Sequence, residues 1–514
     1  MHATLTRRRR YAVLGAVLVA VLAINLDTTI VNVALPTLAD DLGSGTRSLQ
    51  WIVDGYNLAF AALVLAAGSL SDKFGRRPAL LVGLLGFAAA RAAGAMVSSA
   101  PALIVARVGM GSAAALIFPT TLSIISNTFT ERRERAAALG VWGAVVGVGV
   151  AAGPVTGGFL LEHFAWNSIF WALVPLALLA AGLGAAVVPE SREPGTPRLD
   201  RSGLVLSTAV LTALTYTIIE APDRGWASAP TLGGFALALV LAAAFVRQER
   251  RTPHPMLDVT LFADRRFSAA SGAVTVTFFS LAGFIFLITQ YFQFVRGYGT
   301  LSTGARILPV AICIAIASVI GAILAPRIGT RSVVTTGMLL FGSAFLWIAQ
   351  VGVDASYPRV IVPQMVLMGL GMGLISTPAT ESILQVLPPA RAGIGSAVND
   401  ATRELGGTLG VAVVGSVFSS VYAHALADGR LGGLPSGTVA AAGDSVGVGA
   451  ALTAGGPLQG AFQDAFLSGL QTSCTVVGLL CVVGALFAAA LLPGAGPRVA
   501  ETEADEPDLV AAGA

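Results

Sequence analysis

Residues 11–35 read YAVLGAVLVAVLAINLDTTIVNVAL, an apolar run that carries one carboxylate, Asp27, deep inside it. Because about 20 apolar residues span the hydrocarbon core of a bilayer, the run predicts a transmembrane helix. A carboxylate near the middle of such a helix costs roughly 2.5–3.5 kcal/mol on insertion scales. A chain tolerates that cost when the group faces a watery cavity and binds a proton or a cation. The leading hypothesis is therefore a membrane transporter driven by a titrating acid. The alternative is a buried structural acid that is hydrogen-bonded to a neighbouring helix.

The composition of the whole chain supports a membrane protein. Of its 514 residues, 55% are hydrophobic and only 11% are charged, and the mean hydropathy is +0.79. A soluble domain carries about 25% charged residues. The three cysteines lie within apolar runs, which argues against both a disulfide framework and a metal site (Cys313, Cys474 and Cys481). The sequence indicates no cofactor and no nucleic-acid partner.

Apolar runs along the chain predict fourteen spans and an all-α membrane fold. They cover roughly residues 11–35, 49–70, 78–97, 101–125, 136–161, 165–188, 203–221, 230–247, 267–295, 301–325, 332–351, 359–383, 395–424 and 464–493. We expect four regions. They are a six-span bundle over 1–190, two inserted spans with their loops over 191–266, a second six-span bundle over 267–493 with a long, flexible outer loop at about 425–463, and a disordered cytoplasmic tail over 494–514.

The distribution of arginine predicts the orientation. Arg7 to Arg10 lead directly into the first span, which should act as its own insertion signal. If this end is cytoplasmic, most other arginines also fall in inner loops. The outer side then receives only Arg47, Arg224, Arg296, Arg306, Arg359 and Arg430. By the positive-inside rule we expect a multi-pass protein of the cytoplasmic membrane with both termini in the cytoplasm.

Two loops are similar to each other and indicate an internal repeat. Between spans 2 and 3 the chain reads GSLSDKFGRRP over 68–78, and between spans 10 and 11 it reads GAILAPRIGTR over 321–331. A tight, basic, glycine-containing turn at equivalent places implies two related six-span halves. Such halves form transporters with a central site at their interface, which opens alternately to either side of the membrane.

Four motifs resemble the major facilitator superfamily, specifically its fourteen-span drug:proton antiporters. LDTTIVNVALP over 26–36 looks like the first-span signature of that group, and 68–78 matches the general loop motif of the superfamily. Arg107, within IVARVGMG over 104–111, matches the buried arginine of the fourth span. GVGVAAGPVTGG over 147–158 is similar to the fifth-span antiporter motif. The resemblance covers nearly the whole chain and implies two six-helix bundles plus two extra helices.

Two of these motifs are expected to control conformation. In the fifth span, small residues allow a neighbouring helix to approach closely, and a proline bends the helix: Gly149, Gly153, Pro154, Gly157 and Gly158. The alternative for that span is ordinary small-residue packing. The loop motif contributes Gly68, Asp72, Gly75, Arg76 and Arg77. We expect Asp72 to cap the next span, and the two arginines to meet lipid headgroups or acidic residues across a gate.

The intramembrane charges are the candidate coupling site. Besides Asp27, they comprise Asp54 in span 2 and the group Asp400, Arg403 and Glu404 in span 13. Spacings of three and four residues share a helix face, so Arg403 can pair with Asp400 while Glu404 stays near both. The alternative is a permanently paired structural triad. Relatives use acids in these spans for protons or cationic drugs, and Arg107 is expected to be the electrostatic partner of one acid. Arg91 could snorkel outward or pair with an acid.

Polar and aromatic residues inside other spans are candidates for a substrate cavity. They are Asn32, Gln290, Tyr291, Gln293 and Asn399, alongside phenylalanines of span 9 such as Phe278. Aromatic faces attract cations, and a few amides suit planar hydrophobic compounds. Some relatives carry a further acid in span 10, and residues 304–326 contain none. This difference argues against efficient binding of divalent cations.

The sequence therefore predicts a proton-coupled multidrug antiporter that exports hydrophobic, often cationic, drugs or antibiotics. Its expected partners are these small molecules, protons and membrane lipids, and we expect it to act as a monomer. One alternative is a dedicated exporter of a single endogenous specialised metabolite. Another is a membrane-integral enzyme or receptor, which the absence of a Ser/His or His/carboxylate cluster disfavours. Nucleotide-driven transport is disfavoured because the chain has no phosphate-binding loop.

Overall fold

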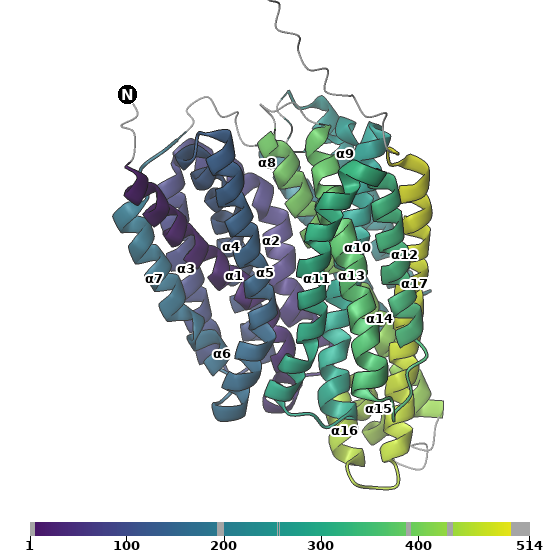
Figure 1. The fold of residues 1–514 in the computed structure, drawn as a ribbon. Coiled ribbons are helices and arrows are strands. Elements are labelled where there is room, and N and C mark those ends of the chain that lie inside the picture. The colour runs from purple at the N-terminus through teal and green to yellow at the C-terminus, as the bar shows by residue number, and fades with distance from the viewer. Residues whose placement is uncertain are drawn as a thin grey trace, which may run out of the picture.

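The computed structural model describes residues 6–192, 200–253, 255, 257–386, 392–428 and 435–494, and the described residues form helices and loops without strands (Figure 1). Thirteen helices are long and apolar enough to cross a membrane. A fourteenth span results when the pair Thr46–Val64 and Ala66–Phe74, bent by 54°, is taken as one. The predicted all-α fold with fourteen spans is thus confirmed. We call the end of the molecule where α1 begins the proximal face, and the opposite end the distal face.

The first six spans pack into one bundle, drawn from purple to blue in Figure 1. The sixth span consists of a short helix followed directly by a longer one. The elements are α1 (Arg7–Asp41), α2 (Thr46–Phe74), α3 (Arg76–Met96), α4 (Ala100–Thr128), α5 (Arg132–His163), α6 (Ser168–Trp171) and α7 (Leu173–Val187).

The last six spans form a second bundle, in which two spans contain a π-helical turn. The elements are α10 (Arg265–Gln290) with η2 (Tyr291–Val295), α11 (Thr300–Ile328), α12 (Thr330–Ile348), η3 (Tyr357–Ile361) with α13 (Val362–Gln385), α14 (Ala392–Asp428) and α17 (Gln459–Leu491). A 3₁₀ turn, η1 (Val259–Ala263), precedes this bundle.

The two bundles repeat the same packing. The contacts of α2 with α4, α1 with α5 and α3 with α7 correspond to those of α11 with α13, α10 with α14 and α12 with α17. The two similar loops have equivalent geometry. Gly75 and Gly329 have φ values of +117° and +90°, a region that favours glycine. Just after each glycine, a backbone N–H donates a hydrogen bond to the chain that follows the sixth span of the same bundle. Arg76 N donates to Ser191 O at 2.9 Å, and Arg331 N donates to Pro493 O at 3.1 Å.

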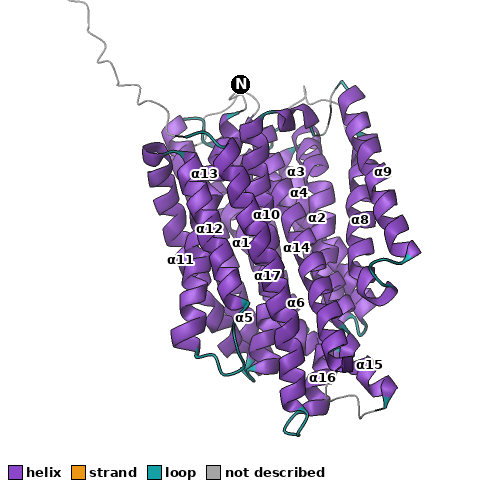
Figure 2. Ribbon diagram, turned by 90° about the vertical axis from the view of Figure 1, so that its right-hand side faces the viewer, coloured by secondary structure: helices purple, strands orange, loops and turns teal. Residues whose placement is uncertain are grey.

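The inserted pair, α8 (Arg201–Arg224) and α9 (Ala229–Arg251), lies at one side of the molecule (Figure 2). Helix α8 contacts both bundles. Ser416 Oγ of α14 donates to Ile218 O at 2.9 Å, and Arg47 of α2 forms an ion pair with Asp223 at 2.7 Å. Helix α9 packs against α8 and leaves most of its surface exposed, as expected of a helix that faces lipid.

The prediction of a long flexible loop at about 425–463 is wrong in part. Helix α14 extends to Asp428, and the segment contains α15 (Ser436–Asp444) and α16 (Val446–Thr453) before α17 begins at Gln459. Small apolar residues allow these short helices to pack, and Ala442 and Val446 are buried. Ser445 stabilises the start of α16, because its Oγ accepts a hydrogen bond from Val448 N. The predicted tail lies almost entirely outside the described residues.

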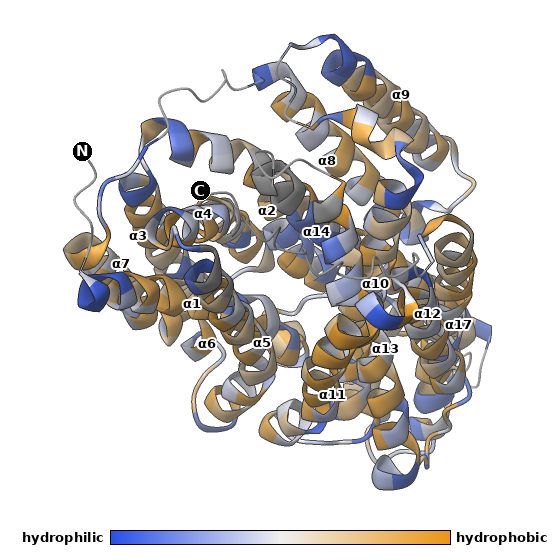
Figure 3. Ribbon diagram, turned by 45° about the horizontal axis from the view of Figure 1, so that its top comes forward, coloured by the Kyte–Doolittle hydropathy of each residue, from blue (hydrophilic) through white to orange (hydrophobic). Residues whose placement is uncertain are grey.

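The outer surface of the molecule is apolar. Figure 3 shows hydrophobic residues along outer helices such as α11, with hydrophilic residues near the helix ends. Large apolar side chains stand exposed along the spans, among them Val105, Leu239 and Leu486. In water such a surface would favour aggregation, whereas in a bilayer it faces lipid.

Candidate functional site

Asp27 lies in a dry cluster inside the first bundle. Its side chain is fully buried on α1 and forms ion pairs with Arg91 of α3 and Arg107 of α4, the latter at 2.9 Å. Both arginines are also buried. Two guanidinium groups therefore surround one carboxylate, and this group of three residues is called the Asp27 cluster below. Sequence reasoning gave Arg91 no definite partner. The only signal was that it interrupts an apolar run, as Asp27 does.

Each arginine of the Asp27 cluster has further partners on neighbouring helices. Arg91 donates from Nε to Phe170 O at 3.1 Å and from Nη2 to Ile169 O, which ties α3 to α6. Arg107 donates from Nε to Ile52 O at 2.9 Å, and its guanidinium lies 4.4 Å from the centre of the Tyr56 ring, which ties α4 to α2. The cluster thus joins five helices of the first bundle, and its polar groups are well satisfied.

Asp54 has the opposite environment. It is fully buried on α2, and neither carboxylate oxygen has a hydrogen-bond partner among the described residues. One turn earlier, Gln50 Nε2 donates to Ala412 O at 3.1 Å and to Ser416 Oγ at 3.3 Å, both on α14. Since residues four apart share a helix face, Asp54 faces α14 of the second bundle. Burying an unpaired acid is costly, so this position points to a function.

The second group of charges lies on α14. Asp400 is 7% exposed, while Arg403 and Glu404 are half-buried. The predicted ion pair of Arg403 with Asp400 does not form in the part of the chain that the structure describes. Instead, the guanidinium lies 4.9 Å from the centre of the Phe278 ring on α10, although it remains near both carboxylates. Helix spacing places these side chains on one face, but the arginine lies over an aromatic ring of a neighbouring helix instead of pairing with Asp400.

The cavity candidates lie in three different places. Asn32 and Gln293 lie where α1 meets α10: Gln293 Nε2 donates to Val33 O at 2.9 Å, and Asn32 Nδ2 donates to Thr28 O at 3.0 Å. Gln290 and Tyr291 are buried within the second bundle, where the ring centres of Tyr291 and Phe466 lie 6.3 Å apart. Asn399 accepts a hydrogen bond from Thr380 on α13 at 3.1 Å.

The small residues of α5 form two distinct contacts. Gly149, Gly153 and Gly157 pack against α1 of the same bundle, and a Cβ at Gly149 would lie 2.7 Å from that of Asn25. Pro154 and Gly158 instead contact α11 of the second bundle. Thr300 Oγ1 donates to Gly158 O at 2.9 Å. The motif therefore joins α1 to α11 through α5, across the boundary between the bundles.

The loop motif forms contacts within the first bundle. Asp72 does not cap α3, contrary to the prediction, because its carboxylate accepts a hydrogen bond from Arg76 Nε at 2.8 Å. Arg77 donates to Ala185 O on α7. Gly68 packs beside Pro119 of α4. Arg76 lies one turn after Asp72 and offers the Asp72 carboxylate a charged donor. A hydrogen bond from a charged donor is stronger than one from the backbone N–H groups of a helix cap.

The bundles are joined at the distal end. Four hydrogen-bonded positions join the two bundles in the distal half of the helices: those of Gln50, Gln293 and Thr300, and that of Ser445 Oγ to Ser44 O at 3.4 Å. Asp54, Asp400 and Glu404 lie on the proximal side of these contacts along their helices. We call this set of contacts the distal seal. It closes one end of the interface in which the acids lie.

The chain belongs to the major facilitator superfamily, because the family model of that name matches residues 17–411. This confirms the family predicted from the motifs. The protein is accordingly a multi-pass membrane transporter and not an enzyme.

Several curated relatives cover nearly the whole chain. The multidrug efflux pump LfrA of Mycolicibacterium smegmatis is 35% identical over 488 residues, which are 94% of this chain and 96% of the relative. The tetracenomycin C resistance and export protein of Streptomyces glaucescens is 32% identical over 94% of this chain and 91% of its own length. The puromycin resistance protein pur8 of Streptomyces alboniger is 35% identical over 82% of this chain and 84% of its own length.

Solved structures share the fold. A bacterial homologue of the human lysosomal transporter Spinster, in an inward-facing and unoccupied conformation, aligns with a TM-score of 0.66 at 18% identity, over 95% of this chain and 97% of that one. At this identity the similarity concerns the fold alone.

Proposed function

We propose that this protein is a proton-coupled antiporter that exports hydrophobic, often cationic, drugs or antibiotics across the bacterial cytoplasmic membrane. The observation that carries the proposal is the position of Asp54. It is a fully buried acid with no hydrogen-bond partner among the described residues, and it faces the helix of the other bundle that carries Asp400 and Glu404. A proton or an organic cation bound there would compensate the buried charge. The efflux and resistance proteins among the relatives support export as the direction of transport.

Orientation follows from the arginine distribution. If the proximal face is cytoplasmic, the distal seal closes the transporter to the outside, and the interface with its acids is reached from the cytoplasm. An exporter must load its substrate in such a state. Rocking of the two bundles, with α5 moving against α11, would then break the distal seal and open the interface outward.

The acids have different proposed roles. Asp54 carries the proton, and Asp400 and Glu404 attract the cationic substrate or a second proton. Asp27 is less suited to carry a proton, because its protonation would leave two buried guanidinium groups without a counterion. The Asp27 cluster instead fixes α2, α3, α4 and α6 relative to α1, and Arg91 acts as a positioning residue. The sequence pointed first to Asp27 as the proton carrier, whereas we propose Asp54 at the interface between the bundles.

A second candidate function is export of one endogenous specialised metabolite. A tetracenomycin C resistance and export protein and a puromycin resistance protein are among the relatives, and each name gives a single compound. The range of compounds to which an efflux-deficient host becomes resistant separates the two functions. Resistance to unrelated cations supports a multidrug exporter, whereas resistance to one compound supports a dedicated one.

Transport in proteoliposomes tests the proposal. With an imposed pH gradient, the wild type should move ethidium toward the acidic side, and Asp54→Asn should abolish this movement. Asp464→Asn is the matched control, because Asp464 is an exposed acid on α17 in the second bundle. Gradient-driven movement in Asp54→Asn at the wild-type rate would remove Asp54 from the mechanism. A wild type that moves ethidium without regard to the gradient would refute proton coupling.

A further inference from the structure

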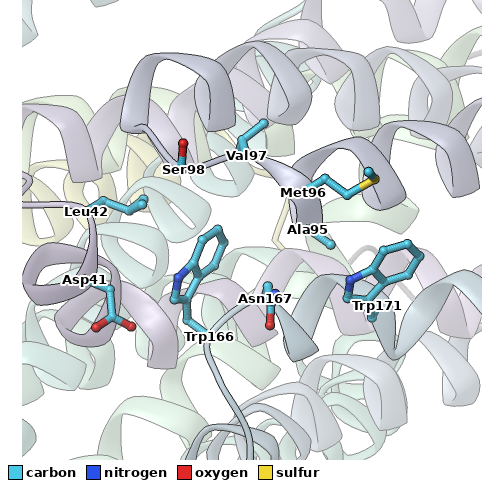
Figure 4. Close-up of a pocket in the computed structure, with 9 residues that line it drawn as sticks. All are labelled: Asp41, Leu42, Ala95, Met96, Val97, Ser98, Trp166, Asn167 and Trp171. Carbon is cyan, nitrogen blue, oxygen red and sulfur yellow. The ribbon is translucent and has the colours of Figure 1, made fainter.

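A groove with a volume of about 550 Å³ opens at the distal end of the first bundle (Figure 4). Three segments form it: the end of α1 with Asp41, the end of α3 with Met96 and Ser98, and the turn into α6 with Trp166 and Asn167. Trp171 of α6 completes the wall beside Met96. No residue of the α2–α14 interface lines it, so the groove is separate from the site proposed for transport.

The groove combines one carboxylate, Asp41, with aromatic and apolar side chains and two neutral polar ones, Ser98 and Asn167. Trp166 and Trp171 present two indole rings, and Met96, which is 76% exposed, adds a thioether. In the described part of the chain, the Asp41 side chain forms neither a hydrogen bond nor an ion pair. Neither lysine nor arginine lines the groove. Indole faces attract cations more strongly than other aromatic rings do.

These groups select the charge of the ligand. A hydrophobic monocation finds a carboxylate and two indole rings, and its apolar groups can lie along Met96. The headgroup of a zwitterionic phospholipid would also bring a phosphate, for which the wall offers only the neutral groups of Ser98, Asn167 and the indoles, beside the carboxylate of Asp41. A volume of several hundred Å³ is typical of sites for drug-sized molecules.

We infer that this distal groove is a second binding site, outside the transport pathway, for hydrophobic organic monocations such as tetraphenylphosphonium. The inference rests on the proposed function only for the class of ligand, because hydrophobic cations are also the compounds that we propose the protein exports. Binding at the groove requires neither the pH gradient nor Asp54.

Protection of a cysteine inside the groove tests this site. Ser98→Cys is introduced into the full chain with Cys313→Ser, because Cys313 is half-buried and the other two cysteines are buried. The protein is placed in nanodiscs of phosphatidylcholine, and alkylation by a charged maleimide is timed with and without tetraphenylphosphonium. Ser98 is exposed, so the introduced cysteine should react. We expect saturating cation to slow the reaction at least fivefold, and Asp41→Asn or Trp166→Ala to abolish the protection.

Controls separate the groove from other sites. Asp464→Asn and Trp347→Ala change an exposed acid and an exposed tryptophan of the second bundle, and both should leave the protection intact. Asp54→Asn should also retain it, so a failure of the proposed transport mechanism would not affect this result. Equal reaction rates with and without the cation, protection that persists in Asp41→Asn, or a cysteine that does not react at all would overturn the inference. Protection by phosphatidylethanolamine in the nanodisc, without added cation, would assign the groove to lipid instead.

Discussion

Asp27 and Asp54 are both buried carboxylates in transmembrane helices, but they have opposite surroundings. Asp27 lies between two arginines, whereas neither oxygen of Asp54 has a partner in the described structure. From the sequence the two positions look alike, because each is an acid within an apolar run. The difference depends on Arg91 and Arg107, which lie on other helices, so only the packing of the bundle reveals it.

The Asp27 cluster should be important for stability. Removing one partner of a buried ion pair costs about 3–5 kcal/mol, because the other charge is left uncompensated. We therefore expect Asp27→Asn and Arg91→Leu to lower the thermal unfolding midpoint of the purified protein markedly. Arg47→Leu is the control, since its ion pair with Asp223 is exposed and is worth about 0–1 kcal/mol. A wild-type midpoint for Arg91→Leu would contradict the positioning role of Arg91.

Asp54 should show the reverse behaviour. Asp54 has no hydrogen-bond partner in the described part of the chain, so replacing it by the similarly sized asparagine removes no observed interaction. We therefore expect the stability of Asp54→Asn to remain within about 1 kcal/mol of the wild type. Transport driven by the pH gradient should nevertheless be lost. If thermal unfolding shows that Asp54→Asn is as unstable as Asp27→Asn, then Asp54 has a structural role and its loss of transport carries no information on proton coupling.

At the scale of helices, α5 is one of the elements that link the bundles. Its glycines pack on α1, while Gly158 and Pro154 meet α11 at the distal seal. The sequence motif predicted close packing of this helix, but it did not show that two different faces meet two different bundles. Which face of α5 meets the second bundle depends on the position of α11, and a local sequence pattern does not give that position.

A large side chain at the α5–α11 contact should prevent the distal seal from closing. Overpacking costs about 1–3 kcal/mol, which would shift the balance between inward-open and outward-open states by roughly 5- to 150-fold. We expect Gly158→Leu to increase the distance between spin labels on the distal ends of α5 and α11. Gly140→Leu is the matched control, because open space surrounds that glycine of the same helix. An unchanged distance distribution in Gly158→Leu would show that this contact does not hold the seal.

The helices themselves were largely predictable from the sequence, and their contacts were not. The apolar runs place each span within a few residues of the observed helix, since length and hydropathy determine which segments cross a bilayer. Arg403 and α15–α16 differ from the predictions for a common reason. The ring of Phe278 and the packing of Ala442 and Val446 offer contacts that composition and spacing do not reveal. Asp72 differs for another reason, because its partner Arg76 lies four residues further on, a spacing that the sequence does show.

At the scale of the whole molecule, the distal seal predicts access from one side only. Asn57 lies less than one turn beyond Asp54 on α2, toward the proximal face, and is half-buried. In the Cys313→Ser background, we expect Asn57→Cys to react with an impermeant maleimide in inside-out membrane vesicles and to be protected in right-side-out cells. Ser98→Cys, at the distal groove, should show the opposite pattern. Reaction of Asn57→Cys mainly from outside would reverse the proposed orientation or conformation.

The central claim is that a proton and a cationic substrate exclude each other at the interface acids. The most direct test is to measure protons released when tetraphenylphosphonium binds to the purified protein in weakly buffered solution. Binding linkage requires that a cation which displaces a proton releases it to the solvent. We expect proton release from the wild type and from Asp41→Asn, and little or none from Asp54→Asn combined with Glu404→Gln. Two results would contradict the account. One is a double variant that releases as many protons as the wild type, and the other is a wild type that binds tetraphenylphosphonium without releasing any proton.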